Sequence, residues 1–211
     1  MNIDAKKKTK TIKPALITSK HTLVYLSRLS STEKAAAFRA SDIFLAAQLR
    51  ANFNNCVVDV LLDRLVRAQQ CLELAKRLAK AYEKKPADEE SLRGAIGRAY
   101  YSMHHSLRAM AFHQLEYDPD SHDESIAVFT KLLNNNAFRA RTGLKKRAAE
   151  NVSEAKINRS IADYSPYNMS RHPESMAWMQ LTGEDWTKAA NFNIRWAEKI
   201  LGGAMKLVGL S

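Results

Sequence analysis

An arginine and a histidine seven residues apart are the residues of this chain best suited to chemistry on a phosphate. Arg98 and His105 lie in the segment Gly97–Phe112, which has no glycine or proline after its first residue and therefore predicts one helix. At about 100° and 1.5 Å per residue, the two side chains project from one face about 10.5 Å apart along the axis. Arginine supplies a fixed cation and histidine titrates near neutral pH, a combination that suits a phosphate. His104 projects well away from that face.

The same spacing also has a plain structural interpretation. His105 then lies at the edge of the core, and Arg98 is a solvated or ion-paired surface residue. Spacing alone favours this interpretation, because arginine and histidine often occur at helical spacing without a shared role. Tyr101, on the same side as Arg98, either positions a phosphate or stacks a base, or it packs within the fold, and packing is favoured.

The order of residues in this helix resembles a known family. The run Arg98-Ala-Tyr-Tyr-Ser-Met-His-His is similar to the signature helix of the HEPN superfamily, which typically reads Arg-Ala-Tyr-Tyr-Ala-Met-Phe-His. Two later segments come in the order that this family shows. Ser121-His122 follows a short loop and opens the next helix, and Arg159-Ser-Ile-Ala-Asp163-Tyr164 ends a later one. The resemblance covers about residue 57 to the C-terminus.

Two residues depart from the family pattern. His104 stands where phenylalanine is usual, so the motif can be counted from Arg98 to His104 or to His105, and the helical geometry favours His105. Gly97 stands where a polar residue is often seen beside the arginine. This second departure keeps a function without catalysis in consideration.

The resemblance implies a metal-independent endoribonuclease without a cofactor, acting as a toxin or in defence. In such an enzyme the 2′-hydroxyl of RNA attacks the adjacent phosphorus, His105 moves protons and Arg98 stabilises the phosphate. Family members commonly pair so that two such motifs face one another, which implies a homodimer. A nucleotidyltransferase-type antitoxin is a candidate partner besides RNA. The supporting site candidates are His104, Tyr101 and Asp163.

Two other functions compete with the ribonuclease. One is a non-catalytic HEPN module that binds RNA, a nucleotide or a partner protein, and the other is a structural helical adaptor. The intact pair of Arg98 and His105 favours the ribonuclease over both. Arg159, Asp163 and Tyr164 are expected to form a hydrogen-bonding cluster that closes the bundle, although Asp163 is also a candidate to orient Arg98 or His105.

The composition predicts an all-α fold. The 211 residues include only seven glycines and five prolines, and alternating Val/Ile/Thr runs and Asn-Gly or Asp-Gly turns are absent. We expect an up-and-down bundle of four to five helices with an extra N-terminal helix and a basic tail. The expected ranges are residues 1–30 for the flexible tail, 31–56 for the accessory helix and 57–211 for the HEPN-like bundle.

Apolar periodicity and capping boxes predict where the helices lie. Helices are expected over about 32–50, 57–84 and 89–114, with a break at Asn52–Asn55. Later helices are expected to be capped by Ser121, to pass through about 150–163, and to be capped by Thr182. A loop is expected over 164–173 because of its two prolines.

Several site classes find no support in the sequence. Cys56 and Cys71 have neither zinc-like spacing nor a secretory context, so reduced thiols in a cytoplasmic protein are expected. The histidines lack the His-Glu-x-x-His pattern and nearby carboxylates, so no metal site is expected. No apolar run approaches ~18 residues, so no membrane span is expected.

Basic residues gather in two places. Residues 1–30 carry seven cationic side chains and one acidic side chain, Asp4. The local excess of six positive charges is more than half of the net charge of +11. This tail is either a nucleic-acid-binding arm or a solubilising leader. A second patch at 139–147 is interpreted as a solvated helix face slightly more readily than as a phosphate-binding one. The candidate nucleic-acid-binding residues are Lys6, Lys7, Lys8, Lys10, Lys145, Lys146 and Arg147.

Overall fold

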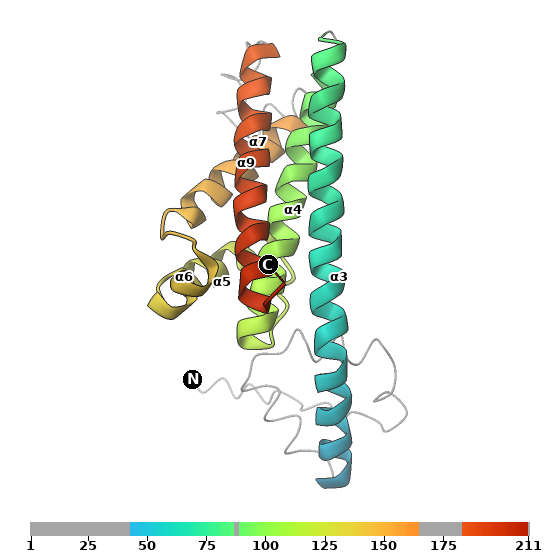
Figure 1. Ribbon diagram of the computed structural model, residues 1–211, viewed down its shortest axis with the longest axis vertical. Coiled ribbons are helices and arrows are strands. Elements are labelled where there is room, and N and C mark those ends of the chain that lie inside the picture. Colours follow the sequence, from blue (N-terminus) through green and yellow to red (C-terminus); the bar gives the residue numbers. More distant parts are fainter. Residues whose placement is uncertain (1–42, 87–88, 165–182, 211) are drawn as a thin grey trace, which may run out of the picture.

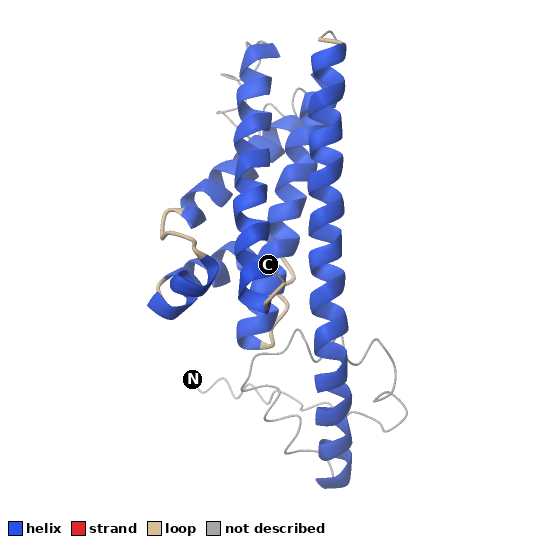
Figure 2. Ribbon diagram, viewed as in Figure 1, coloured by secondary structure: helices blue, strands red, loops and turns tan. Residues whose placement is uncertain are grey.

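The computed structural model describes residues 43–86, 89–164 and 183–210, and these ranges contain helices and loops but no strand. The helices pack as a bundle (Figures 1 and 2). They are α3 (Ile43–Lys84), α4 (Glu89–Leu115), α5 (His122–Leu133), α6 (Asn136–Thr142), α7 (Ala148–Tyr164) and α9 (Gly183–Val208). The all-α bundle predicted from the composition is confirmed, with six described helices in place of four or five.

The predicted signature helix is the centre of the bundle. Figure 1 shows α3, α4 and α9 side by side along the long axis, with α4 antiparallel to α3 and with α5, α6 and α7 against one side. Helix α4 contacts α3, α5, α7 and α9. Its fully buried side chains include Leu92, Ile96, Tyr100, Met103, Leu107 and Met110. The helix that carries the candidate site therefore also carries much of the hydrophobic core, which fixes the orientation of its remaining face.

The predicted ends of α4 and α5 are confirmed. Helix α4 spans Glu89–Leu115, close to the expected 89–114. Ser121 caps α5, because its hydroxyl accepts a hydrogen bond from the Glu124 backbone N–H at 3.1 Å. The Glu124 carboxylate in turn accepts from the backbone N–H of Asp120 at 2.8 Å. This reciprocal arrangement resembles a capping box displaced by one residue, and it fixes the turn that leads out of α4.

The predicted break at Asn52–Asn55 is wrong. Helix α3 continues through these residues as one element of 42 residues, so the expected boundary between residues 31–56 and 57–211 falls inside a helix. Asparagine is only a weak helix breaker, costing roughly 0.5–0.7 kcal/mol relative to alanine, and no glycine or proline interrupts this run. The lower part of α3 extends past the other described helices (Figure 1).

Helix α6 was not predicted as a separate element. Its N-cap is Asn135, whose side chain accepts from the backbone N–H groups of Ala137 and Phe138. Its C-cap is Gly143, which has a φ of 70° and thus the left-handed conformation that glycine adopts without strain. A basic connection, residues 143–147, then leads into α7.

Several predictions fall outside the described residues. These are the basic tail 1–30 with Lys6, Lys7, Lys8 and Lys10, the accessory helix before residue 43, the loop 165–173 and the Thr182 cap. The side chains of Cys56 and Tyr164 also lie outside the description. None of the described helices is apolar over a stretch long enough to cross a bilayer.

Candidate functional site

The other described helices cover one face of the central helix only in part, and that face carries the predicted pair. Between Ser91 and Phe112, every residue of α4 is buried except Arg93 and four others: Gly94, Arg98, Tyr101 and His105. These four positions follow the i, i+4, i+7, i+11 spacing of a single helix face. We refer to Gly94, Arg98, Tyr101 and His105 as the α4 stripe. Opposite to it, α4 packs on α9, where the amide of Asn193 donates to the Ile96 carbonyl at 3.3 Å.

Arg98 is the one residue of the α4 stripe in the exposed class, and it forms no ion pair or hydrogen bond with any other described residue. It lies on the side of α4 that faces α3. Burial raises the pKa of the Cys71 thiol on α3, and the positive charges of Arg98 and Arg67 oppose that rise. Cys71 is a free thiol. Arg98 is thus an available cation at the boundary between α3 and α4.

His105 is half-buried and is held in its neutral form. Burial, followed by the positive charges of Arg64, Arg108 and Arg67, lowers the pKa of His105 to about 4. Its buried Nδ1 has no hydrogen-bond partner among the described residues. At neutral pH the imidazole is therefore uncharged and able to accept a proton, and Nε2 is the ring nitrogen left for a ligand.

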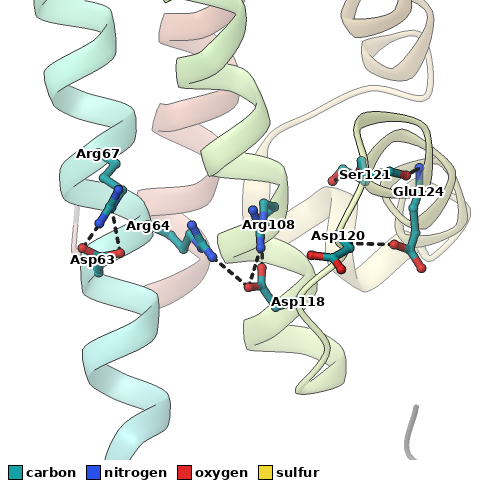
Figure 3. Close-up of polar contacts among 9 residues, drawn as sticks. Asp63, Arg64, Arg67, Arg108, Asp118, Asp120, Ser121 and Glu124 are labelled. Atoms are coloured by element: carbon teal, nitrogen blue, oxygen red, sulfur yellow. Dashed lines mark hydrogen bonds and ion pairs between the residues drawn. The ribbon is translucent and has the colours of Figure 1, made fainter. Parts of the chain in front are cut away.

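Charged residues that the sequence analysis missed form the electrostatic surroundings of His105. Asp118, only 2% exposed, accepts two hydrogen bonds from the Arg108 guanidinium at 2.6 Å and a third from Arg64 at 2.8 Å (Figure 3). Beside them, Arg67 pairs with Asp63 on the exposed side of α3. The Asp118 contacts join α3, α4 and the turn after α4. Local spacing gives no sign of them, because Arg64 and Asp118 are 54 residues apart.

Tyr101 and Asp163 belong to a second cluster, on the side of α4 that faces α7. The Arg159 guanidinium donates to the Tyr101 hydroxyl at 3.0 Å and lies 5.3 Å from the centre of its ring. Arg159 also pairs with Asp163, with 2.5 Å between Nε and Oδ2. The cluster predicted for Arg159 and Asp163 is confirmed. Asp163 forms no hydrogen bond or ion pair with Arg98 or His105 among the described residues, and its alternative role in orienting them stays a prediction.

His104 points away from the α4 stripe, as the helical geometry predicts. It is 6% exposed, and its ring lies 4.2 Å from the ring of His122 between centroids and 6.5 Å from that of Tyr100. Burial is the main cause that lowers the pKa of His104 to about 3, and the charges of His122 and Arg108 add to it. This neutral, enclosed imidazole packs against aromatic rings.

The small residues near the α4 stripe serve packing inside the chain. These residues are Gly94, Gly97 and Ser102. A Cβ atom at Gly94 would lie 3.2 Å from Leu78 on α3, and one at Gly97 would lie 3.4 Å from the Asp163 carboxylate on α7. Ser102 is completely buried. These residues let α3 and α7 approach α4, so they give no argument for a dimer.

The basic patch predicted at 139–147 lies on another side of the molecule. Lys145, Lys146 and Arg147 are exposed in the connection between α6 and α7. Two of them, Lys145 and Arg147, line a cavity together with residues of α9. The structure therefore brings Arg98, Tyr101 and His105 together and places the basic patch apart from them.

The described residues contain no group of three or more histidine, cysteine, aspartate or glutamate side chains placed to hold a metal ion. In comparisons with known proteins, no family model and no curated protein matches this chain. The resemblance to the HEPN superfamily therefore rests on the residues of the motif and stays a prediction.

Proposed function

We propose that this protein is a metal-independent endoribonuclease of the HEPN type, in which Arg98 and His105 act on a phosphate of single-stranded RNA. One observation supports this above all. On the central helix, where almost every residue is buried, the one continuous face that is not fully buried carries Arg98, Tyr101 and His105 in register, and Arg98 is exposed there. A surface arginine or a core-edge histidine can occur by chance. Here both lie on the α4 stripe of a rigid, packed helix, and a functional site needs side chains that a rigid element holds in place.

The proposed reaction uses the substrate's own nucleophile. The 2′-hydroxyl oxygen of the ribose attacks the adjacent phosphorus, and its proton passes to Nε2 of neutral His105. The bond from phosphorus to the 5′-oxygen breaks, and that oxygen takes up the proton that the His105 imidazole has accepted, which restores neutral His105. Arg98 stabilises the additional negative charge on the phosphate oxygens. The products are a 2′,3′-cyclic phosphate and a 5′-hydroxyl end.

The proposed enzyme is a homodimer, because one helix face supplies only one arginine and one histidine. A second copy facing the α4 stripe would add a second arginine to stabilise the charge on the phosphate and a second imidazole beside it. A role as a toxin or defence component, and a nucleotidyltransferase-type antitoxin, belong to the same proposal on the strength of the resemblance alone.

The test is cleavage of a labelled single-stranded RNA in the presence of a metal chelator. Arg98→Ala and His105→Ala are each expected to lower the rate by about 10²–10⁴-fold. His104→Phe is the matched control, since it removes a neighbouring histidine whose ring points away, and it is expected to lower the rate far less. Circular dichroism of each variant checks the fold. Cleavage by the double variant at the wild-type rate, or no cleavage by the wild type, contradicts the proposal.

The alternative is a non-catalytic module that binds RNA, a nucleotide or a partner protein. The observation that favours it is the low pKa of His105, about 4, because an imidazole so easily deprotonated is a weak general base at pH 7. In that case the wild type binds single-stranded RNA without cutting it. Arg98→Ala then weakens binding, while His105→Ala changes it little.

A further inference from the structure

A cavity of about 650 Å³ lies between α9 and the connection from α6 to α7, away from the α4 stripe. We refer to it as the α9 groove. Glycines of both elements line it: Gly143, Gly202 and Gly203. Gly203 allows α9 to approach the connection closely, since a Cβ atom there would lie 2.8 Å from Leu144. A Cβ atom at Gly202 would meet nothing within 4 Å, so this part of the groove is open. The volume matches pockets that hold nucleotide-sized ligands.

The α9 groove is strongly cationic. Five basic side chains line it, Lys145 and Arg147 from the connection and Arg195, Lys199 and Lys206 from α9. Within the described part of the chain, only Arg147 of these forms an ion pair, with Glu150 at 3.7 Å between two exposed side chains. The one acidic lining residue, Glu198, pairs with Lys76 of α3 at 2.7 Å. So many uncompensated cations in one concave site raise the local concentration of anions.

Aromatic side chains stand among these cations. Trp196 and Phe192 both line the α9 groove and are partly buried against the core, with 6.5 Å between their ring centres. The Lys199 ammonium lies 4.6 Å above the Trp196 ring. An ammonium in this position can move to a phosphate when a base takes its place over the indole. Cations beside a supported aromatic face are the means by which proteins bind nucleotides without sequence preference.

The geometry points to the α9 groove as a binding site for a nucleotide unit, with its base on Trp196 and its phosphates on Lys145, Arg195 and Lys199. Such a unit is supplied either by single-stranded RNA or by a free nucleoside polyphosphate. The inference does not depend on cleavage at the α4 stripe, because it concerns another face of the molecule and is tested by a binding measurement alone.

The experiment measures binding of two probes to the full-length protein by fluorescence anisotropy. One is a labelled single-stranded RNA with 2′-methoxy groups, which cannot be cut through its own 2′-oxygen, and the other is a labelled ATP. Arg195→Ala/Lys199→Ala removes two groove cations, and Arg77→Ala/Lys80→Ala is the matched control on the exposed outer face of α3. For RNA, the groove variant is expected to flatten the log–log salt dependence by about 1.4, or 0.7 for each lost phosphate contact, and the control is not.

Two further variants separate shape and stacking from charge. Gly202→Leu fills the open part of the groove without removing a charge, and it is expected to abolish binding while the protein stays folded. Trp196→Leu removes the stacking surface and is expected to weaken binding about five- to 150-fold.

The outcomes are distinct from those of the cleavage assay. Binding of RNA but not ATP, lost in the groove variants, assigns the site to RNA. Binding of ATP, with competition between the two probes, assigns it to free nucleotides. Equal binding by wild type, the Arg195/Lys199 variant and Gly202→Leu overturns the inference, and so does failure of the wild type to bind either probe.

Discussion

Replacing the buried His104 with phenylalanine is expected to make the protein more resistant to acid. The folded state holds the pKa of His104 at about 3, well below its ordinary value of 6.5. The unfolded chain therefore binds a proton that the folded chain does not, and stability is lost as the pH falls from about 6.5 toward 3. At pH 5, one and a half units below the unfolded value, the loss is about 2 kcal/mol at 1.36 kcal/mol per unit.

Urea denaturation followed by circular dichroism at pH 8 and pH 5 measures this effect. The wild type is expected to lose stability between the two pH values, and His104→Phe to lose about 2 kcal/mol less. The remaining dependence comes from other groups, among them His105 and His122, whose pKa values are also lowered. An equal loss in the variant and the wild type would refute a neutral, enclosed His104. At pH 8, the variant is expected to be about as stable as the wild type, because phenylalanine can occupy the same aromatic surroundings.

Three further outcomes test the packing, the buried charges and the assembly. Gly203→Ala is expected to destabilise the protein by about 1–3 kcal/mol, because its methyl group meets Leu144 at 2.8 Å, whereas Gly202→Ala in open space is expected to stabilise it by about 0.5–1 kcal/mol in urea denaturation. Asp118→Asn is expected to cost about 3–5 kcal/mol, and Asp63→Asn, which breaks an exposed pair, less than about 1 kcal/mol; similar values would contradict the buried role of Asp118. Light scattering is expected to give twice the chain mass of 23.8 kDa, and a monomer at micromolar concentration would count against the dimer.

The helices that the sequence predicted correctly are those with strong local signals. Ser121 caps α5 because a serine followed three residues later by glutamate satisfies free N–H groups whatever the rest of the fold does. The uninterrupted run after Gly97 likewise suffices to place α4. The predicted break at Asn52–Asn55 is wrong because asparagine has only a weak preference against the helix. Propensity differences of less than 1 kcal/mol seldom end a long helix.

The candidate site was predictable in its periodicity and not in its surroundings. Helical spacing placed Arg98 and His105 on one face and His104 off it, because 3.6 residues per turn is a property of the helix alone. The charge around His105 comes from Arg64, Arg67 and Arg108, two of which lie on another helix. Asp118 accepts hydrogen bonds from two of those arginines, Arg64 and Arg108, and it lies in the loop after α4. No local pattern predicts contacts across such separations.

The electrostatics of the α4 stripe bear directly on which function it performs. Burial is the main cause that lowers the pKa of His105, and the positive charges of Arg64, Arg108 and Arg67 add to it. These charges would attract a phosphate, and a bound phosphate would offset the charges although not the burial. His105 is therefore expected to be a weak base in the free protein and a stronger one beside RNA, when proton transfer is needed. The low pKa of the free protein is thus compatible with catalysis on a polyanion, whereas a neutral ligand would leave His105 unable to act. This coupling favours RNA over an uncharged substrate at the α4 stripe.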